Sequence, residues 1–393
     1  MQVHVSCSEL LAVVRQLVKV VPERTPKPVL MNIKIDFGNN LAMATDLERT
    51  VIEPISCQYI DPPSGPILVP AKTLLKILQT THAPMLTFET DDSTRLIIRT
   101  NGGVFNVPTM SADDFPRTPE VESENIASVD EAYTLANAFD IAGKYVSKIY
   151  GVYSINNILL QVTDKMYVTA SDGKAMYVSE IAIKEAGPDR NLRLLIPPPA
   201  ADYIASTFKN SGNKVSIACA KGKIRVEFLH ERSRFIALLA DDGRCYPNWQ
   251  AIVRNKNEAP KFDVVVEAEK LASALRQVAI TTDDYHGVVW ELNEGVWEMR
   301  SQAYERGSGR VRLDVDYDGP AKRVRFNSNY LLPFLNRMPA DEKVEVVLPD
   351  KDENPITLYC GNNALVVMPM RDMPEYDVKE TAVEEEAAVE STV

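Results

Sequence analysis

The sequence predicts an α+β protein made of three homologous domains, each with two helices packed on an antiparallel sheet. The first observation is a repeated segment that closes with an acidic residue and a proline. Its three copies end at Pro116, Pro247 and Pro374, which stand 131 and 127 residues apart, about one ordinary domain length each time. The second observation is a pair of segments in each third whose apolar residues recur at the helical period. The third is a set of short segments in which apolar and polar residues alternate, typical of antiparallel strands.

Each third opens with a predicted amphipathic helix. In the first copy apolar residues at 10, 14, 17 and 18 follow the helical period over residues 8–19, with Ser8 as the expected N-cap. Its counterparts are residues 132–146 and 268–280. A second helix follows a strand in mid-domain, within residues 68–78, 195–208 and 325–335. Prolines near these helix starts are tolerated because the first helical turn has no internal acceptor for the missing N–H.

Alternating segments between the helices, residues 223–228, 311–317 and 344–348, predict strands that are buried on one face. A strand-end turn is expected three times, at residues 44–47, 170–173 and 300–303. Asp46 and Asp172 follow Thr or Ser in two of these copies, where an aspartate can accept hydrogen bonds from its own backbone.

Domain boundaries are expected where Pro, Glu, Asn and Lys cluster, near residues 117–125 and 254–260. The predicted domains are therefore residues 1–124, 125–256 and 257–378. The remaining residues, 379–393, are acidic, low in complexity and without aromatic side chains, so we expect a disordered tail.

Composition places the chain among soluble globular proteins, with 45% hydrophobic and 25% charged residues over 393 positions. No apolar window reaches the ~18 residues that would span a membrane, and the start lacks the sections of a signal peptide. We therefore expect a cytoplasmic protein without a membrane partner. The five cysteines are far apart with no Cys-x-x-Cys pair, which predicts neither a disulfide framework nor a zinc site.

The motifs of catalysis are missing from the sequence. Asp46 and Asp172 are candidate carboxylates for a metal-dependent nuclease, but their matching places in two repeats favour the turn interpretation. The four histidines are isolated, and neither Gly-rich phosphate loop occurs. We therefore expect no catalytic residue, no metal and no cofactor.

The net charge of −12 disfavours nucleic-acid binding. It does not exclude it, because phosphate contacts depend on where Lys and Arg lie rather than on the total charge. Basic residues on the predicted helices are either scattered surface charge or, if all helices face one axis, an inner surface for phosphates. A further alternative is a monomeric repeat protein that binds only peptides.

In their order and spacing, several motifs resemble the bacterial DNA polymerase III sliding clamp, the β subunit, over about residues 3–371. These motifs are Thr45-Asp46-Leu47-Glu48, Val69-Pro70-Ala71-Lys72, Ser171-Asp172-Gly173-Lys174, Phe326-Asn327-Ser328-Asn329-Tyr330-Leu331 and Val366-Val367-Met368-Pro369-Met370-Arg371. The resemblance implies a head-to-tail homodimeric ring of six clamp domains around duplex DNA. It also implies a non-catalytic processivity factor of DNA replication that tethers the replicative DNA polymerase. A closed ring holds DNA by topology, so its phosphate contacts can stay weak and permit sliding.

The resemblance also implies three sets of site residues. Partners such as the polymerase, the clamp loader and other proteins with a clamp-binding motif would insert a peptide into a pocket between the second and third domains. That pocket would use Ile155, Ser171, Gly173, Lys174, Ala175, Met176, Pro247, Ile252, Val366, Val367, Met368, Pro369, Met370 and Arg371. Methionines suit a surface that accepts several peptides. Arg24, Lys72 and Lys148 would contact DNA, and Ile77, Phe105, Val107, Ile280 and Thr281 would form the dimer interface, edge strand against edge strand. Residues 372–376, which repeat the Asp-x-Pro ending, are expected to lie ordered on the surface.

Overall fold

The chain forms two units, one of residues 1–168 and 180–246 and the other of residues 169–179 and 247–393, called unit 1 and unit 2 below. The computed structural model describes residues 1–61, 65–90, 95–117, 123–187, 191–220, 222, 224–240, 243–253, 263–349, 351 and 353–371. The segments predicted at 254–260, 372–376 and 379–393 lie outside the described residues.

Two helices come from each third of the sequence, as the apolar periodicity predicts. They are α1 (Cys7–Leu17), α2 (Ala71–Thr80), α3 (Ala132–Ala142), α4 (Pro198–Phe208), α5 (Ala268–Val278) and α6 (Ser328–Leu335). Helix α1 buries Leu10, Val14 and Leu17 on one stripe. Its cap differs from the prediction, because Ser6 rather than Ser8 accepts the backbone N–H of Glu9, at 3.4 Å. The preceding strand ends at Ser6, so the cap lies two residues earlier than the apolar period alone indicates.

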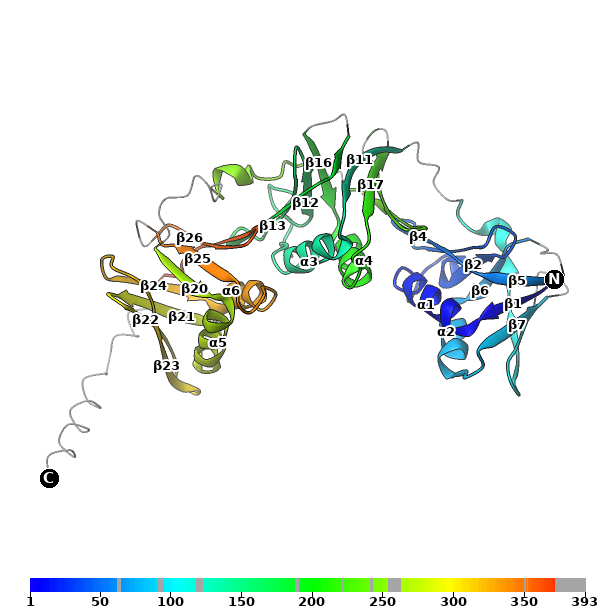
Figure 1. Cartoon of the computed structure of the whole chain (residues 1–393), viewed down its shortest axis with the longest axis horizontal. Helices are drawn as coiled ribbons and strands as arrows, with labels where there is room; N and C mark the ends of the chain where they lie inside the picture. Colours follow the sequence, from blue (N-terminus) through cyan, green and yellow to red (C-terminus); the bar gives the residue numbers. More distant parts are fainter. Residues whose placement is uncertain are drawn as a thin grey trace, which may run out of the picture. The chain divides into compact units, whose positions relative to one another are not determined.

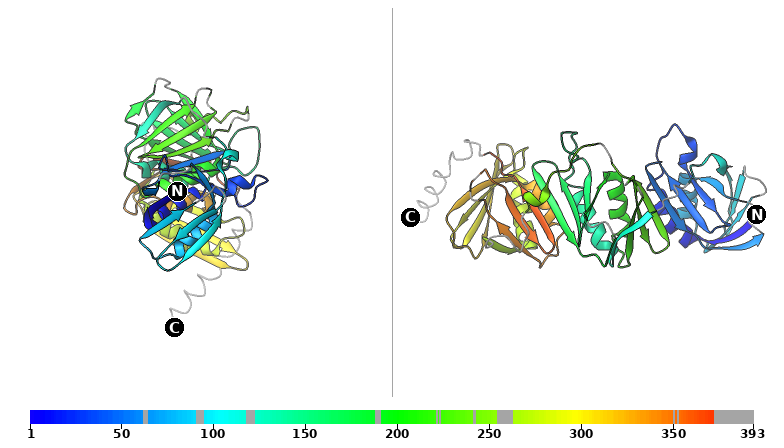
Figure 2. Two further views of the ribbon diagram at one scale, coloured as in Figure 1. Left: turned by 90° about the vertical axis from the view of Figure 1, so that its right-hand side faces the viewer. Right: turned by 90° about the horizontal axis from the view of Figure 1, so that it is seen from above.

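Unit 1 contains a ten-stranded antiparallel sheet shared by the first two thirds of the chain. Its order is β10 (Met110–Ser111), β6 (Ile67–Pro70), β2 (Asn32–Asp36), β3 (Leu41–Thr45), β4 (Arg49–Pro54), β19 (Ser233–Leu238), β18 (Arg225–His230), β17 (Val215–Ala220), β11 (Ser123–Val129) and β15 (Glu185–Ala186). The two repeats join where β4 pairs with β19, with Val51 opposite Phe235. Within unit 1, α1, α2, α3 and α4 lie on the same side of this sheet (Figure 1; further views in Figure 2).

A second sheet of unit 1 ends in an edge strand. Its order is β5 (Cys57–Asp61), β1 (Gln2–Ser6), β7 (Met85–Glu89), β8 (Arg95–Arg99) and β9 (Val104–Pro108). A hairpin turn at residues 101–103 joins β8 to β9, and Gly102 has a φ of +91° there. A further pair, β12 (Ile158–Val162) with β16 (Leu192–Ile196), also belongs to unit 1.

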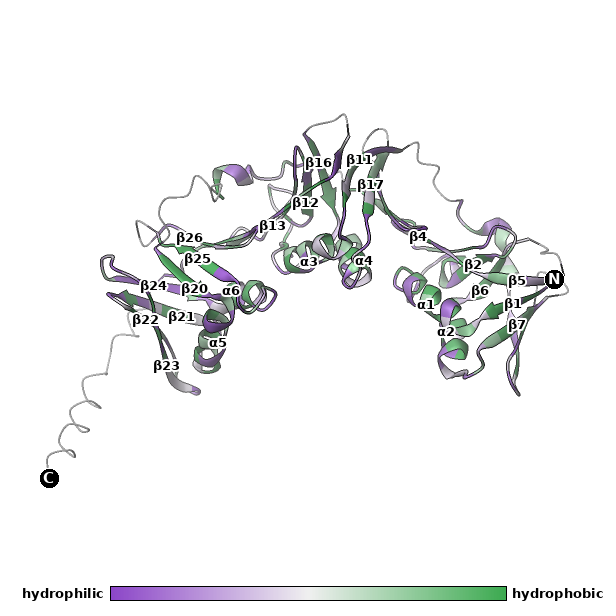
Figure 3. Ribbon diagram, in the orientation of Figure 1, coloured by the Kyte–Doolittle hydropathy of each residue, from purple (hydrophilic) through white to green (hydrophobic). Residues whose placement is uncertain are grey.

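Unit 2 holds two groups of antiparallel strands with α5 and α6. One runs in the order β14 (Ala175–Ile181), β27 (Asn363–Val367), β26 (Ile356–Cys360), β25 (Lys343–Val347) and β20 (Val264–Glu267). The other has the order β23 (Gly307–Asp314), β22 (Val296–Ala303), β21 (Gly287–Asn293) and β24 (Lys322–Asn327). Hydrophobic residues, green in Figure 3, are prominent along β20. The chain enters unit 2 within strand β13 (Met166–Ser171) and returns to unit 1 near the end of β14. Residues 169–179 therefore belong to unit 2.

The third predicted turn is wrong. Residues 300–303 lie inside β22, and Ser301 pairs with Gly309 across the hairpin. The chain turns directly after these residues, at 304–306. Gln302 replaces the aspartate of the other two copies, so the side chain that would end the strand there is absent. Among the described residues, no helix is long and apolar enough to cross a membrane.

Candidate functional site

The hairpin tip between β13 and β14 is held by its own side chains. Ser171 Oγ donates to the Ala175 carbonyl at 2.8 Å and accepts from the Gly173 backbone N–H at 3.1 Å. Asp172 Oδ1 accepts from the N–H groups of Lys174 and Ala175 at 2.8 and 2.9 Å. Gly173 has a φ of +89°, which a residue without Cβ adopts at little cost. The aspartate turn predicted from the sequence is thus confirmed here.

The second oxygen of Asp172 ties this tip to α6. The Tyr330 hydroxyl donates to Asp172 Oδ2 at 2.7 Å. The pKa of Tyr330 is raised, mainly by burial and further by the hydrogen bond to Asp172. The hydroxyl therefore keeps its proton and remains a donor at neutral pH.

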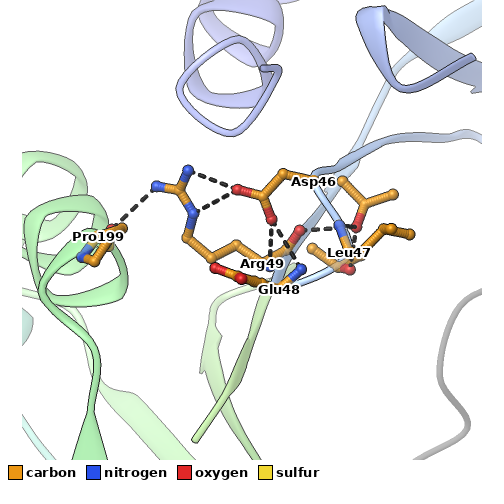
Figure 4. A network of polar contacts seen from close by, with 7 residues as sticks. Asp46, Leu47, Glu48, Arg49 and Pro199 are labelled. Atoms are coloured by element: carbon orange, nitrogen blue, oxygen red, sulfur yellow. Dashed lines mark hydrogen bonds and ion pairs between the residues drawn. The ribbon is translucent and has the colours of Figure 1, made fainter. Parts of the chain in front are cut away.

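The same turn occurs in unit 1 around Asp46 (Figure 4). Asp46 Oδ1 accepts from the backbone N–H groups of Glu48 and Arg49 at 3.0 and 2.6 Å. Its Oδ2 accepts from Arg49 Nε and Nη2 at 2.8 and 2.6 Å, and Arg49 Nη1 reaches the Pro199 carbonyl of α4 at 3.1 Å. Both aspartates proposed for a nuclease are therefore engaged in turns. Within the described part of the chain, no group of three or more His, Cys, Asp or Glu residues is placed to hold a metal ion.

Strand β27 brings most of the predicted peptide-pocket residues together in unit 2. Val366 and Val367 stand opposite Met176 and Ala175, and these four side chains are buried. The chain then continues past the hairpin tip, because the Met368 N–H donates to the Lys174 carbonyl at 2.8 Å.

Beyond β27 the predicted pocket residues reach the surface. Met368 is 43% exposed, Pro369 and Met370 are half-buried, and Lys174 and Arg371 are exposed. The exposed side chains of this segment are thus those of Met368, Lys174 and Arg371, next to the buried valines of β27.

The other predicted pocket residues are placed as follows. Pro247 is half-buried in unit 2, just before a 3₁₀ helix at Trp249–Ala251. Ile252 follows that helix with an exposed side chain, and its N–H donates to the Trp249 carbonyl at 2.9 Å. Ile155 belongs to unit 1, where its carbonyl accepts from the Ser147 N–H at 2.9 Å.

All three predicted DNA-binding residues are exposed in unit 1. Arg24 follows α1, Lys72 lies in the first turn of α2, and Lys148 follows α3. Lys72 Nζ is 3.9 Å from a carboxylate oxygen of Glu23, and both side chains are largely exposed, so this ion pair contributes little.

Sequence reasoning missed the loop that follows Lys148. Ile149, Tyr150, Val152 and Tyr153 are all exposed, although side chains of this size are usually covered. Arg244 braces the loop, because its guanidinium donates to the Gly151 carbonyl at 2.9 Å and lies 5.3 Å from the Tyr150 ring centroid. A run of large apolar residues without helix or strand period, directly after a lysine, is the signal that indicates such a loop.

The predicted dimer-interface residues lie partly on the surface and partly in the core. Phe105 is exposed on edge strand β9, whereas Val107 on the same strand and Ile77 on α2 are buried. In unit 2, Ile280 is 72% exposed in a 3₁₀ helix, Ala279–Thr281. The Thr281 hydroxyl is satisfied internally, 2.6 Å from Ser301 Oγ.

Comparison with protein families gives two matches. A family model described as the N-terminal domain of the DNA polymerase III beta subunit matches residues 1–119. A second, for the C-terminal domain of the same subunit, matches residues 258–371.

Full-length relatives carry the same description. The chain is 22% identical over 381 residues to the beta sliding clamp of Chlamydia muridarum, covering 94% of this chain and 99% of that one. It is 25% identical over 361 residues to the beta sliding clamp of Pseudomonas putida, covering 90% of this chain and 95% of that one.

Solved structures share the fold. A sliding clamp from Pseudomonas aeruginosa, bound to griselimycin, superposes with a TM-score of 0.84 at 21% identity, covering 95% of this chain and all (100%) of that one. The sliding clamp from Bacillus subtilis gives a TM-score of 0.83 at 18% identity, with the same coverage of 95% and 100%. The repeated helix pairs on antiparallel sheets and the full-length matches agree, and the chain belongs to the bacterial DNA polymerase III β sliding clamp family, whose members are non-catalytic processivity subunits of that polymerase.

Proposed function

We propose that two copies of this chain close head to tail into a ring around duplex DNA, without reading its sequence. The ring tethers the replicative DNA polymerase, and it also serves the clamp loader and other proteins with a clamp-binding motif. These partners bind the surface around Met368, Met370, Lys174 and Arg371 in unit 2, called the peptide surface below. The protein works in the cytoplasm.

The observation that carries this proposal is the ten-stranded sheet of unit 1, which keeps two helix pairs on one side. Arg24, Lys72 and Lys148 are exposed at or beside these helices. A few exposed cations give weak, salt-dependent attraction to phosphates without base recognition. Weak contact suits a protein that slides along DNA, since encirclement rather than affinity keeps it in place.

The peptide surface is supported by the exposure of Met368 beside the fixed hairpin tip. A thioether chain repacks at low cost, so it accommodates peptides of different sequence. Lys174 and Arg371 at its border suit a carboxylate in the incoming peptide. The turn at Asp172 holds the tip rigid before the peptide arrives, which lowers the entropy lost on binding.

Ring closure is supported by edge strands in both units. Strands β9 and β23 each end their sheet, and an edge strand presents N–H and C=O groups that can pair with another chain. Phe105 and Ile280 offer exposed apolar area. A heterologous contact of this kind gives a closed ring when the rotation closes.

Retention on plasmid DNA tests the encirclement. Protein loaded onto a nicked circular plasmid should stay bound through gel filtration and be lost once the plasmid is cut at one site. Equal loss from both forms, or equal retention on both, contradicts the ring.

The mass in solution separates the ring from a monomeric peptide-binding protein. The ring requires about twice the chain mass of 43.8 kDa. Sedimentation at micromolar concentration should therefore give the dimer, and a monomer at every concentration would favour the alternative.

A further inference from the structure

One face of the four-stranded sheet in unit 2 gathers arginines. Across β22 and β23, Arg300 stands opposite Arg310 and Glu298 opposite Arg312. Side chains opposite one another in adjacent strands share a face, and the register through β21 and β24 adds further members to the same face. We call the set the arginine face: Arg300, Arg310, Arg312, Arg323 and Arg325, together with Glu291, Glu298 and Asp314.

The arginine face is turned away from the core of unit 2. Its neighbours in sequence, Trp297 and Met299, are fully buried on the other face. Ser301 points the same way as these two, since its hydroxyl donates to the Val278 carbonyl of α5 at 2.5 Å. The arginine face therefore covers the outside of the sheet, where Arg310 and Arg312 are exposed and Arg325 is buried at 2% exposure.

Carboxylates on this face offset only part of its charge. Glu298 bonds Arg300 and Arg312, and Glu291 lies 3.3 Å from Arg300 and 3.7 Å from Arg323. Burial alone would raise the pKa of Glu298, but the hydrogen bonds from Arg312 and Arg300 lower it overall. Glu298 is thus ionised and already engaged.

Arg325 is paired with a third carboxylate, Asp283, at 2.7 Å. Asp314, opposite Val296 and two residues from Arg312, shares the face. Five guanidinium groups against these four carboxylates leave a net charge of +1. No ion pair joins the exposed Arg310 to a carboxylate in the part of the chain that is described. Arg310 also faces Arg300, and like charges directly opposite in a sheet repel. The face can therefore accept additional anionic groups.

The chain passes the edge of this sheet just before its acidic segment. The Met370 N–H donates to the Arg325 carbonyl at 2.8 Å, as an antiparallel bridge to β24. Residues 372–393 contain eight carboxylates and one basic residue, Lys379, for a net charge of −7.

Length does not limit the contact. Twenty-two residues span up to roughly 73 Å when extended, whereas four strands are only about 14 Å across. Acidic side chains spaced along such a segment can reach Arg310 and Arg312 on the far strand.

We propose that residues 372–393 bind back onto the arginine face of the same chain. The acidic segment covers guanidinium groups that would otherwise attract phosphates to this face of the protein. The ion pairs are exposed, so the docked state is weak and sensitive to salt.

Photo-crosslinking in the full-length chain tests this contact. With p-benzoylphenylalanine in place of Tyr376, irradiation at low salt should give crosslinks that mass spectrometry maps to β22, β23 and β24. Raising the salt to about 0.5 M, where the Debye length is only a few ångströms, should remove most of them. The measurement uses neither DNA nor a partner peptide, so its outcome is independent of the proposed ring and peptide surface.

Matched variants separate specific docking from general charge effects. Arg310→Gln with Arg312→Gln should lower the crosslink yield to the sheet about fivefold, as expected for two exposed ion pairs. Lys270→Gln with Lys343→Gln removes the same charge from residues that pair with Glu267 elsewhere in unit 2 and should leave the yield unchanged. Arg310→Gln alone, with a melting curve to verify folding, keeps the test valid if the double variant is unstable.

Three results would overturn the proposal. The first is a crosslink yield that the arginine variants do not change. The second is a set of crosslinks that map around Met368, which would place the segment on the peptide surface instead. The third is a distribution spread evenly over the protein.

Discussion

At the scale of single residues, Asp46 and Asp172 show how a carboxylate acts in structure rather than in catalysis. Each accepts two backbone N–H bonds in its own turn. The turns differ at the next position, where Gly173 has a φ of +89° and Leu47 one of +82°. A leucine is strained in this conformation, so the first turn relies more on the Arg49 contact.

Removal of the Asp172 side chain should destabilise unit 2. Asp172→Ala loses both backbone contacts and leaves the Tyr330 hydroxyl without this acceptor, which should cost about 1–3 kcal/mol in the free energy of unfolding. Asp172→Asn keeps the Oδ1 acceptor and should cost about half as much. Urea titration measures both, and equal losses for the two variants would count against the turn as the cause.

Loss of the exposed methionines should weaken partner binding without breaking the dimer. Met368→Ala with Met370→Ala should raise the dissociation constant of a polymerase-derived peptide at least about tenfold, or ~1.4 kcal/mol. Calorimetry measures the affinity. Met85→Ala removes a methionine of unit 1 with the same 43% exposure and should change nothing. Unchanged affinity in the double variant would refute the assignment of this surface.

At the scale of elements, unit 1 places a buried carboxylate where its two repeats meet. Glu53 on β4 lines a cavity of about 240 Å³ between α1 and α4. It accepts a hydrogen bond from Ser233. Burial raises the pKa of Glu53 more than Ser233 and Lys19 lower it, and Glu231 adds to the rise. The junction of β4 with β19 therefore contains a group that is costly to ionise.

The sign of the resulting pH dependence follows from the raised pKa. A carboxyl whose folded pKa exceeds its unfolded value contributes stability below the unfolded pKa, and this contribution is lost as the pH rises through the folded pKa. Glu53→Gln should therefore increase the free energy of unfolding at pH 8 and change it little at pH 4. Urea titrations at both pH values test this, and a loss of stability at pH 8 would contradict it.

At the scale of the whole molecule, the ring depends on contacts between copies. An acidic residue at Ile280 would place a charge in a desolvated interface, which is strongly unfavourable. Ile280→Glu should therefore shift the sedimenting species from the dimer toward the 43.8 kDa chain mass. Ile149→Glu alters an isoleucine of similar exposure, 78% against 72%, outside the predicted interface and should remain a dimer. A dimeric Ile280→Glu protein would exclude this residue from the interface.

Periodicity in the sequence was sufficient to predict the six helices and the antiparallel strands, because these patterns are local. The threefold repeat was predicted from motifs that recur about one domain length apart. The aspartate turns were equally readable, since an aspartate bonds backbone groups only two and three residues away. The peptide surface came from the family resemblance, and its residues stay a prediction. Periodicity alone would have assigned Met368 to the core.

The tertiary structure decided what depends on residues far apart in the chain. The cap of α1 moved to Ser6 because β1 ends there, and the third turn was lost because β22 continues through Ser301 in its pairing with β23. The exposed loop after Lys148 is braced by Arg244, nearly a hundred residues later. The arginine face exists only through the register of four strands. Short-range periodicity sets helices and strands, whereas pairing across strands decides which side chains share a surface.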